Sequence, residues 1–129
     1  MITATKTLRL RETLRSEIDL IAKRSRRSFS EVTQALIEEA LRMRKCAGIY
    51  FGDERGGREA KIACSGLGVW EVIAVHKAVS KKESALRARF PWLTQAQLSG
   101  ALNYYRNYSD EIDALIDENE TLYPHILRA

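Results

Sequence analysis

A strand-like segment near the N-terminus has no partner in the surrounding sequence. Its apolar residues, Leu8 and Leu10, alternate with polar residues in the two-residue period of a β-strand. The polar positions are Thr7, Arg9 and Arg11. Two helical patterns follow at once, so no neighbouring segment can pair with this one. Because an isolated strand is not stable in water, the segment needs a partner from elsewhere.

Two amphipathic helices are predicted directly after the strand. The first is expected to begin with Thr13 as its N-cap, and the second near Ser30. Ser28 and Glu31 also have the spacing of a capping box, which leaves the cap of the second helix open. The apolar stripe of this helix is wide and comprises Val32, Leu36, Ile37, Ala40, Leu41 and Met43. A 45-residue segment cannot cover such a stripe by itself, so we expect a dimer.

A change of pattern after Cys46 predicts a second domain. Two β-like runs, at 48–51 and 59–63, flank a polar segment that contains two glycines, which indicates a hairpin. Four short helices are expected behind it. Their predicted caps are Ser80 with Glu83, Thr94 with Gln97, and Ser109. The expected core comprises Leu67, Trp70, Phe90, Trp92 and Leu93.

Charge is distributed unevenly along the 129 residues. Residues 1–45 hold 11 basic and 6 acidic side chains, residues 46–106 hold 9 and 5, and residues 107–129 hold 1 and 6. A basic front and an acidic tail suggest two different partners, of which the front suits nucleic acid. Solvated helix faces are the alternative explanation of the same counts.

The order strand, helix, helix, with a basic and threonine-bearing strand, resembles the ribbon-helix-helix DNA-binding family over residues 4–45. In that family two chains pair their strands into a ribbon that enters the major groove, so the resemblance implies an intermolecular two-stranded ribbon. Backbone N–H groups around Ser30 and Glu31 are expected to bind phosphate. The implied DNA-binding residues are Thr7, Arg9, Arg11, Arg26, Arg27, Ser28 and Ser30. The alternative is that residues 5–11 add an edge strand to the later hairpin.

Residues 47–118 resemble the domain-of-unknown-function family 433. The motifs are G-x-G-V-W at 66–70, P-W-L-T-x-x-Q at 91–97, and a tyrosine-rich helix that runs into Asp-Glu-Ile at 110–112. The resemblance implies a homeodomain-like helical module of a kind that often acts as an antitoxin beside PIN-like ribonuclease toxins. The helix over 94–107 would then take the recognition-helix position and offer Gln95, Gln97, Asn103 and Arg106. A scaffold that presents a toxin-binding surface is the simpler reading of this module.

The acidic C-terminal segment combines negative charge with late apolar residues, which suits a segment that folds onto a partner. A toxin that processes nucleic acid should have a basic groove, which an acidic segment can cover. The residues expected to bind the toxin are Asp110, Glu111, Asp113, Asp117, Glu118 and Tyr123. A solvated final helix is the alternative.

Catalytic signals are weak, so we expect a protein that is not an enzyme. Cys64, Ser65 and His76 lie close in sequence, but a catalytic role for them is disfavoured. The glycines at 56–57 and 66–68 complete neither a dinucleotide fingerprint nor a phosphate-binding loop. No metal site or cofactor is expected. The sequence shows neither a signal peptide nor a membrane-spanning run, and a cytoplasmic protein with free thiols is predicted.

Together these patterns predict a mainly α-helical homodimer, or a higher even oligomer, with two domains. Residues 1–45 would form the ribbon-helix-helix domain. Residues 46–129 would form a β-hairpin plus four-helix domain, similar to a homeodomain or helix-turn-helix module. The function that the two resemblances imply is that of an antitoxin that binds operator DNA, represses its own promoter and neutralises a PIN-like ribonuclease. The alternative is a stand-alone transcriptional regulator that has no toxin.

Overall fold

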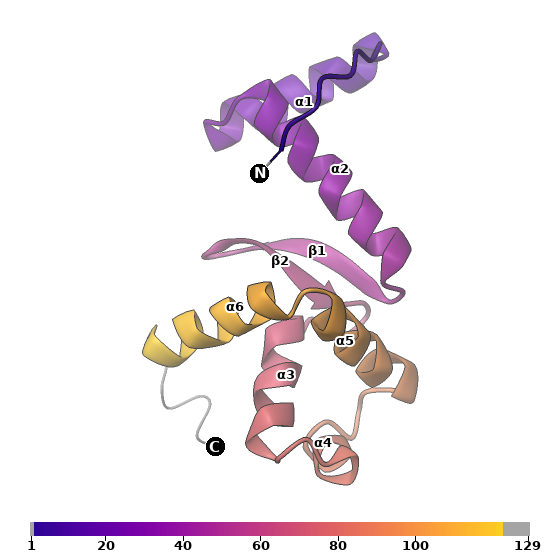
Figure 1. Ribbon diagram of the computed structural model, residues 1–129, viewed down its shortest axis with the longest axis vertical. Coiled ribbons are helices and arrows are strands. Elements are labelled where there is room, and N and C mark those ends of the chain that lie inside the picture. The colour runs from indigo at the N-terminus through magenta and orange to yellow at the C-terminus, as the bar shows by residue number, and fades with distance from the viewer. Residues whose placement is uncertain (1, 123–129) are drawn as a thin grey trace. The chain divides into compact units, whose positions relative to one another are not determined.

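The computed structural model describes residues 2–122, with side chains up to residue 120. Six helices and a two-stranded antiparallel hairpin make up this part of the chain (Figure 1). The predicted mainly α-helical class with one hairpin is confirmed. By its packing the chain divides into two units, Met1–Leu41 and Arg42–Ala129. No described helix has the length and apolar character to cross a bilayer.

Residues 2–11 form no strand in the single chain. In one copy of the protein, the strand expected over residues 5–11 is therefore not formed. These residues do not extend the hairpin either, because the sheet consists of two strands in the described part of the chain. The physical reason is that a strand is stabilised by hydrogen bonds to a neighbour, and residues 2–11 have none to pair with in one chain.

The first unit contains α1, Glu12–Ser25, and most of α2, Phe29–Lys45. Helix α1 begins two residues earlier than predicted, because Arg11 takes the extended N-cap position in place of Thr13. At α2 the capping box decides the start: the Glu31 N–H donates to Ser28 Oγ at 3.1 Å, and the Ser28 N–H donates to a Glu31 carboxylate oxygen at 3.3 Å. The cap is therefore Ser28, and the predicted start at Ser30 is wrong.

The core of the first unit is small. Its buried residues are Ile18, Ala22 and Val32, against which Leu10 and Phe29 pack. Many large apolar side chains of the unit and of the end of α2 stay exposed: Leu8, Leu14, Leu20, Ile21, Leu36, Ile37, Leu41 and Met43. Three buried side chains bury too little apolar surface to hold two helices by themselves.

The second unit begins with the last turn of α2, followed by strands β1, Ile49–Glu54, and β2, Gly57–Ile62. The strands pair antiparallel, with Phe51 opposite Ala60. Both strands reach further toward the turn than the predicted runs. Ile49, Ala60 and Ile62 are buried and form one side of the core.

Four helices complete the second unit, as the sequence predicted: α3, Val69–Ala78, α4, Glu83–Arg89, α5, Gln95–Asn107, and α6, Ser109–Leu122. Helix α3 contacts the other three, and α5 contacts both strands. Figure 1 shows α3 running beneath the hairpin between α5 and α6. The largest fully buried side chains come from the hairpin and all four helices, with one from the loop before α5: Tyr104, Ile62, Ile73, Leu86, Leu93, Leu98 and Ile112.

Of the three helix caps predicted in the second unit, one is confirmed and two are wrong. Thr94 and Gln97 form the expected capping box, in which the Gln97 N–H donates to Thr94 Oγ1 at 3.1 Å. The box predicted from Ser80 and Glu83 is wrong, because Ser80 has a left-handed backbone (φ 56°) and Lys82 is the N-cap. Ser109 is the first residue of α6 and not its cap.

The predicted core of the second unit is largely confirmed. Trp70, Phe90 and Leu93 are buried, and Leu67 packs against them while half-buried. Trp92 is the exception, because 65% of its surface is exposed. Its ring packs against that of Phe90 in a T-shaped arrangement, with the ring centroids 5.7 Å apart.

Candidate functional site

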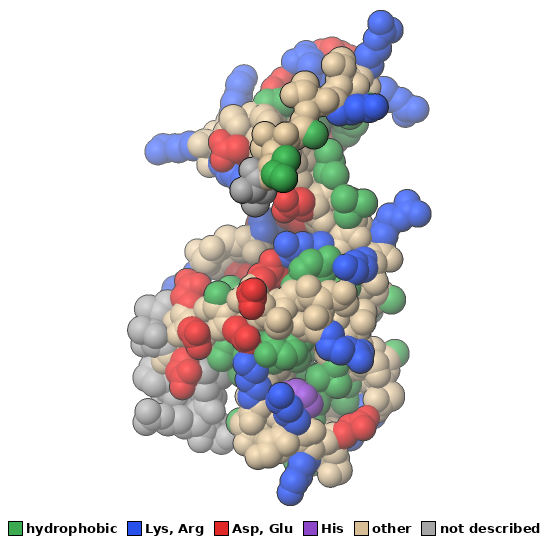
Figure 2. Space-filling model, in the orientation of Figure 1, with side chains coloured by type: hydrophobic (Ala, Val, Ile, Leu, Met, Phe, Trp, Pro, Cys, Tyr) green, Lys and Arg blue, Asp and Glu red, His purple; other side chains and the backbone are tan. Residues whose placement is uncertain are grey.

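The N-terminal arm carries the residues expected to read DNA bases. Thr7, Arg9 and Arg11 are all exposed, whereas Leu10 turns its side chain toward the core of the unit. An exposed guanidinium can bind the O6 and N7 atoms of guanine with two hydrogen bonds. Figure 2 shows Lys and Arg side chains projecting from several sides of this unit.

The turn between α1 and α2 carries the residues expected to contact phosphate. Arg26 caps α1 in a left-handed conformation, and Arg27 lies 3.7 Å from the Glu31 carboxylate. Ser30 accepts a hydrogen bond from Gln34. All these side chains are exposed, so Arg26 and Arg27 remain accessible to a phosphate.

One of the backbone N–H groups expected to bind phosphate at the start of α2 already has a partner. The Glu31 N–H is not free, because it donates to Ser28 Oγ. The Glu31 carboxylate also lies at this helix end, and the Ser28 hydroxyl and N–H bonded to it lower its pKa. A phosphate must therefore approach beside a carboxylate, which favours the arginines over the helix end as its main contact.

Two of the acidic residues assigned to a toxin have partners inside the second unit. Glu111 accepts hydrogen bonds from Arg42 and, at 2.6 Å, from the Tyr104 hydroxyl. Asp113 accepts hydrogen bonds from Lys77 and, at 2.9 Å, from the Tyr105 hydroxyl. Both carboxylates therefore hold α6 against the rest of the unit.

The other acidic residues of α6 are more accessible. Asp110, Asp117, Glu118 and Glu120 are exposed, and acidic side chains gather along this helix in Figure 2. Tyr123, which was also expected to bind a toxin, lies outside the described residues. Fewer acidic side chains are therefore accessible to a partner than the sequence indicated.

Helix α5 uses its polar side chains within the unit. Gln97 caps the helix and donates to the Ala63 carbonyl at 2.9 Å, and Gln95 donates to Glu83 at 3.2 Å. The opposite side of α5 is buried in the core. Two of the four residues that a recognition helix would offer are thus engaged in structural hydrogen bonds.

Of the residues considered for catalysis, two lie in the turn after β2 and the third, His76, lies on α3. Ser65 Oγ donates to the Ile62 carbonyl and accepts from the Leu67 N–H, which closes the turn after β2. Cys64 is exposed in that turn. Burial, reinforced by the charge of Lys81, lowers the pKa of His76, whose Nδ1 is buried without a hydrogen-bond partner in the described structure.

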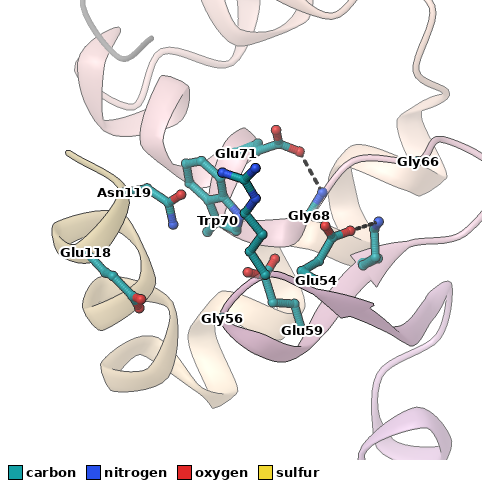
Figure 3. Close-up of a pocket in the computed structure, with 11 residues that line it drawn as sticks. Glu54, Gly56, Glu59, Gly66, Gly68, Trp70, Glu71, Glu118 and Asn119 are labelled. Atoms are coloured by element: carbon teal, nitrogen blue, oxygen red, sulfur yellow. Dashed lines mark hydrogen bonds and ion pairs between the residues drawn. The ribbon is translucent and has the colours of Figure 1, made fainter. Parts of the chain in front are cut away.

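A pocket of about 400 Å³ opens at the turn of the hairpin, between the start of α3 and the end of α6 (Figure 3). The indole of Trp70 forms one wall. Four carboxylates and two cations also line it: Glu54, Glu59, Glu71, Glu118, Arg55 and Lys61. No sequence motif indicates this site, because its charged residues come from both strands, the turn between them, α3 and α6.

The glycines of the G-x-G-V-W motif shape this pocket. Gly66 has a φ of +73°, which a side chain rarely tolerates. A Cβ on Gly68 would lie 2.9 Å from Cδ1 of Trp70. The motif therefore brings the backbone directly against the indole, and Glu71 fixes that backbone by accepting the Gly68 N–H at 2.8 Å.

The carboxylates of the pocket differ in their electrostatic surroundings. Burial raises the pKa of Glu59, and the nearby charge of Glu54 raises it further, while a hydrogen bond from Trp70 opposes the shift. Lys61 is paired with Glu54. The pocket therefore contains a carboxylate whose negative charge is destabilised by its surroundings, and an added positive charge would relieve this.

Among the described residues, no group of three His, Cys, Asp or Glu side chains is arranged to hold a metal ion. Comparisons with protein-family models, with curated proteins and with solved structures found no match for the chain. Function therefore has to be inferred from the residues and the geometry of this chain.

Proposed function

We propose that the protein is an antitoxin that binds operator DNA as a homodimer or a higher even oligomer. The first unit binds DNA and represses the promoter of its own gene. The second unit neutralises a PIN-like ribonuclease in the cytoplasm. The observation that carries the DNA-binding half is the first unit, which has an unpaired basic arm and exposed apolar helices around a core of three buried residues.

A second copy of the chain would give the arm a strand partner and would also cover the exposed apolar side chains of the first unit. Pairing of two arms would give residues 5–11 the neighbour that a strand requires. It would also place Thr7, Arg9 and Arg11 on one face of a two-stranded ribbon, which fits the major groove. The exposed apolar side chains of α1 and α2 would then form the dimer core.

The toxin-binding half of the proposal is supported by the exposed carboxylates of α6. Asp110, Asp117 and Glu118 are the accessible members of the expected set. The engagement of Glu111 and Asp113 within the unit favours the alternative, a transcriptional regulator without a toxin.

Operator binding is tested by fluorescence anisotropy with the DNA upstream of the gene and a scrambled duplex at several salt concentrations. Arg9→Ala should weaken specific binding about 5- to 150-fold, the value of a lost bidentate base contact of about 1–3 kcal/mol. Arg11→Ala should act similarly. Arg44→Ala, which removes an exposed arginine at the end of α2, is the matched control. Equal, weak binding to both duplexes would refute the DNA-binding proposal.

Toxin binding is tested by copurification from the native host and by inhibition of the ribonuclease recovered. A deletion of residues 107–129 is unsuitable, because it removes Ile112 and Ile116 from the core. The variant Asp110→Asn/Asp117→Asn keeps the core and should weaken inhibition. Glu17→Gln/Glu38→Gln removes the same charge from the first unit and should not. Failure to recover any ribonuclease with the intact protein would favour the stand-alone regulator.

A further inference from the structure

An exposed tryptophan lies in the loop between α4 and α5, and the proposed function does not use it. Trp92 is 65% exposed, whereas the next most exposed aromatic side chain of the described residues, Tyr50, is 37% exposed. We propose that this tryptophan and the basic side chains around it bind single-stranded nucleic acid. We call these residues the Trp92 surface: Trp92, Lys82, Arg87 and Arg89. The surface belongs to the second unit and needs neither the N-terminal arm nor a toxin.

The fold holds Trp92 in a fixed position at the surface. The loop turns sharply after α4, because the Leu93 N–H donates to the Phe90 carbonyl at 3.1 Å. It then returns along α4, since Gln95 at the start of α5 donates to Glu83 at the start of α4, at 3.2 Å. The Trp92 ring packs against the buried Phe90. An aromatic side chain held in this way loses little conformational entropy when a partner binds.

The exposed fraction of Trp92 requires an open ring face. The two flat faces make up most of the surface of an indole side chain, so 65% exposure cannot be reached with both faces covered. The rings of Phe90 and Trp92 meet at 76°, so Phe90 does not take the stacking position on the indole. Every nucleic-acid base has a flat π-face and stacks on an open aromatic ring. Trp92 can therefore receive one unpaired base.

Positive charge surrounds the indole. Residues 81–92 hold four basic side chains and one acidic side chain. Arg87 donates to the Leu93 carbonyl, which places a guanidinium beside the residue that follows Trp92. A guanidinium keeps its charge when one of its five N–H groups binds a carbonyl. Arg89 and Lys82 are exposed at the two ends of α4, along which the loop returns. The surface therefore offers cations to the phosphates on either side of a stacked base.

Other partners would use only part of this surface. An acidic peptide would meet the cations, but its carboxylates gain nothing from the negative face of an indole. A membrane surface requires a wider apolar area, and the described helix α4 carries no exposed large apolar side chain beside Trp92. In a duplex each base is already stacked between its neighbours. An unpaired strand of DNA or RNA matches both the indole and the cations.

The first test follows tryptophan emission of the full chain during titration with an oligothymidylate or an oligouridylate of about eight nucleotides at low salt. Stacking of a base should quench Trp92, so we expect saturable quenching, and the tighter of the two strands identifies DNA or RNA as the source. Trp92→Phe retains Trp70 as its single tryptophan and should lose the quenching. Arg9→Ala/Arg11→Ala should retain it, which separates this proposal from operator binding by the arm.

A second test measures the affinity by anisotropy of the labelled strand, with every variant made in the Arg9→Ala/Arg11→Ala chain so that the arm contributes little. Trp92→Ala should weaken binding about 5- to 150-fold, the loss expected when one base–aromatic stack is removed. Trp92→Phe keeps an aromatic ring and should restore most of the affinity. Tyr50→Ala removes the other exposed aromatic side chain of the second unit and should leave the affinity unchanged.

The charge contribution is tested by the salt dependence of the same binding. Arg89→Gln should lower the slope of log affinity against log salt by about 0.7, the value of one phosphate contact on a single strand. Arg106→Gln is the matched control, because Arg106 is likewise an exposed arginine in the last turn of a helix but lies at the end of α5 away from Trp92. It should leave the slope unchanged.

Several results would overturn the proposal. Absence of saturable quenching with both strands, or equal affinities of the Trp92→Ala and Tyr50→Ala proteins, would show that no base stacks on Trp92. Equal effects of Arg89→Gln and Arg106→Gln on the slope would show that the cations of α4 are not the phosphate contacts. Equally tight binding of a duplex of the same length, of polyglutamate or of phosphatidylserine vesicles would assign the surface to one of those partners instead.

Discussion

Arg42 and Glu111 form an ion pair that joins the last turn of α2 to the first turns of α6. The Arg42 guanidinium also donates to the Tyr104 hydroxyl at 3.0 Å and lies 4.4 Å from the ring centroid of Tyr108. About a quarter of its side chain is exposed. These contacts hold the last turn of α2 to α6 within the second unit.

Arg42→Gln should destabilise the second unit by about 1–3 kcal/mol, because it leaves the Glu111 carboxylate partly buried without its charge partner. Arg44→Gln is the matched control, since Arg44 lies in the same helical turn but is exposed. Urea unfolding followed by circular dichroism measures both. Equal effects of the two variants would show that the ion pair contributes no more than general surface charge.

Gly68→Ala should cost about 1–3 kcal/mol, because the added methyl group meets the buried indole of Trp70 at 2.9 Å. Gly56→Ala should change the stability by less than about 0.5 kcal/mol. Its Cβ would make only an ordinary contact, at 3.6 Å from Glu118. Thermal unfolding compares the two variants, and a Gly68→Ala protein as stable as Gly56→Ala would contradict the packing described for the motif.

The pair between Lys77 and Asp113 should make stability depend on pH. The hydrogen bond from Lys77 is the main cause of the lowered pKa of Asp113, to which Tyr105 also donates. The folded protein therefore holds the carboxylate charged to lower pH than the unfolded chain. The stability gained is present above the unfolded-state pKa of about 3.9 and is lost as pH falls through the lower folded-state value.

Asp113→Asn should therefore be less stable than the wild type at pH 7, and the difference should shrink as the pH falls below the unfolded-state pKa of about 3.9 toward the lower folded-state value. Glu120→Gln, on the same helix but exposed, should show no such convergence. Melting temperatures of the wild type and both variants, measured between pH 3 and 7, test this prediction. A constant difference between wild type and Asp113→Asn would mean that the carboxylate contributes through packing alone.

The exposed apolar side chains of α2 should drive self-association. In the single chain Ile37 and Leu41 are 48% and 61% exposed, respectively. Ile37→Ser/Leu41→Ser should weaken the dimer at least about tenfold, because each buried leucine or isoleucine contributes about 1.5–3 kcal/mol. Glu38→Ser changes an exposed neighbour and serves as control. Sedimentation equilibrium measures the association, and a monomeric wild-type protein would refute the prediction.

The helices, the hairpin and most of the core of the second unit could be predicted from the sequence. Apolar periodicity and local capping chemistry specify these features, as the Thr94 and Gln97 box shows, because the interacting residues lie within one or two helical turns. The same reasoning failed at Ser80, where a left-handed turn holds residues that had the spacing of a cap.

Which charged residues are available to a partner depends on how the helices pack, and this could not be predicted. Glu111 and Asp113 look like their exposed neighbours in the sequence, but they meet Arg42 and Lys77 across the fold. The pocket beside Trp70 likewise collects carboxylates from both strands and from α3 and α6. Such contacts join residues up to 69 positions apart, and no local pattern specifies them, because they depend on how whole helices pack.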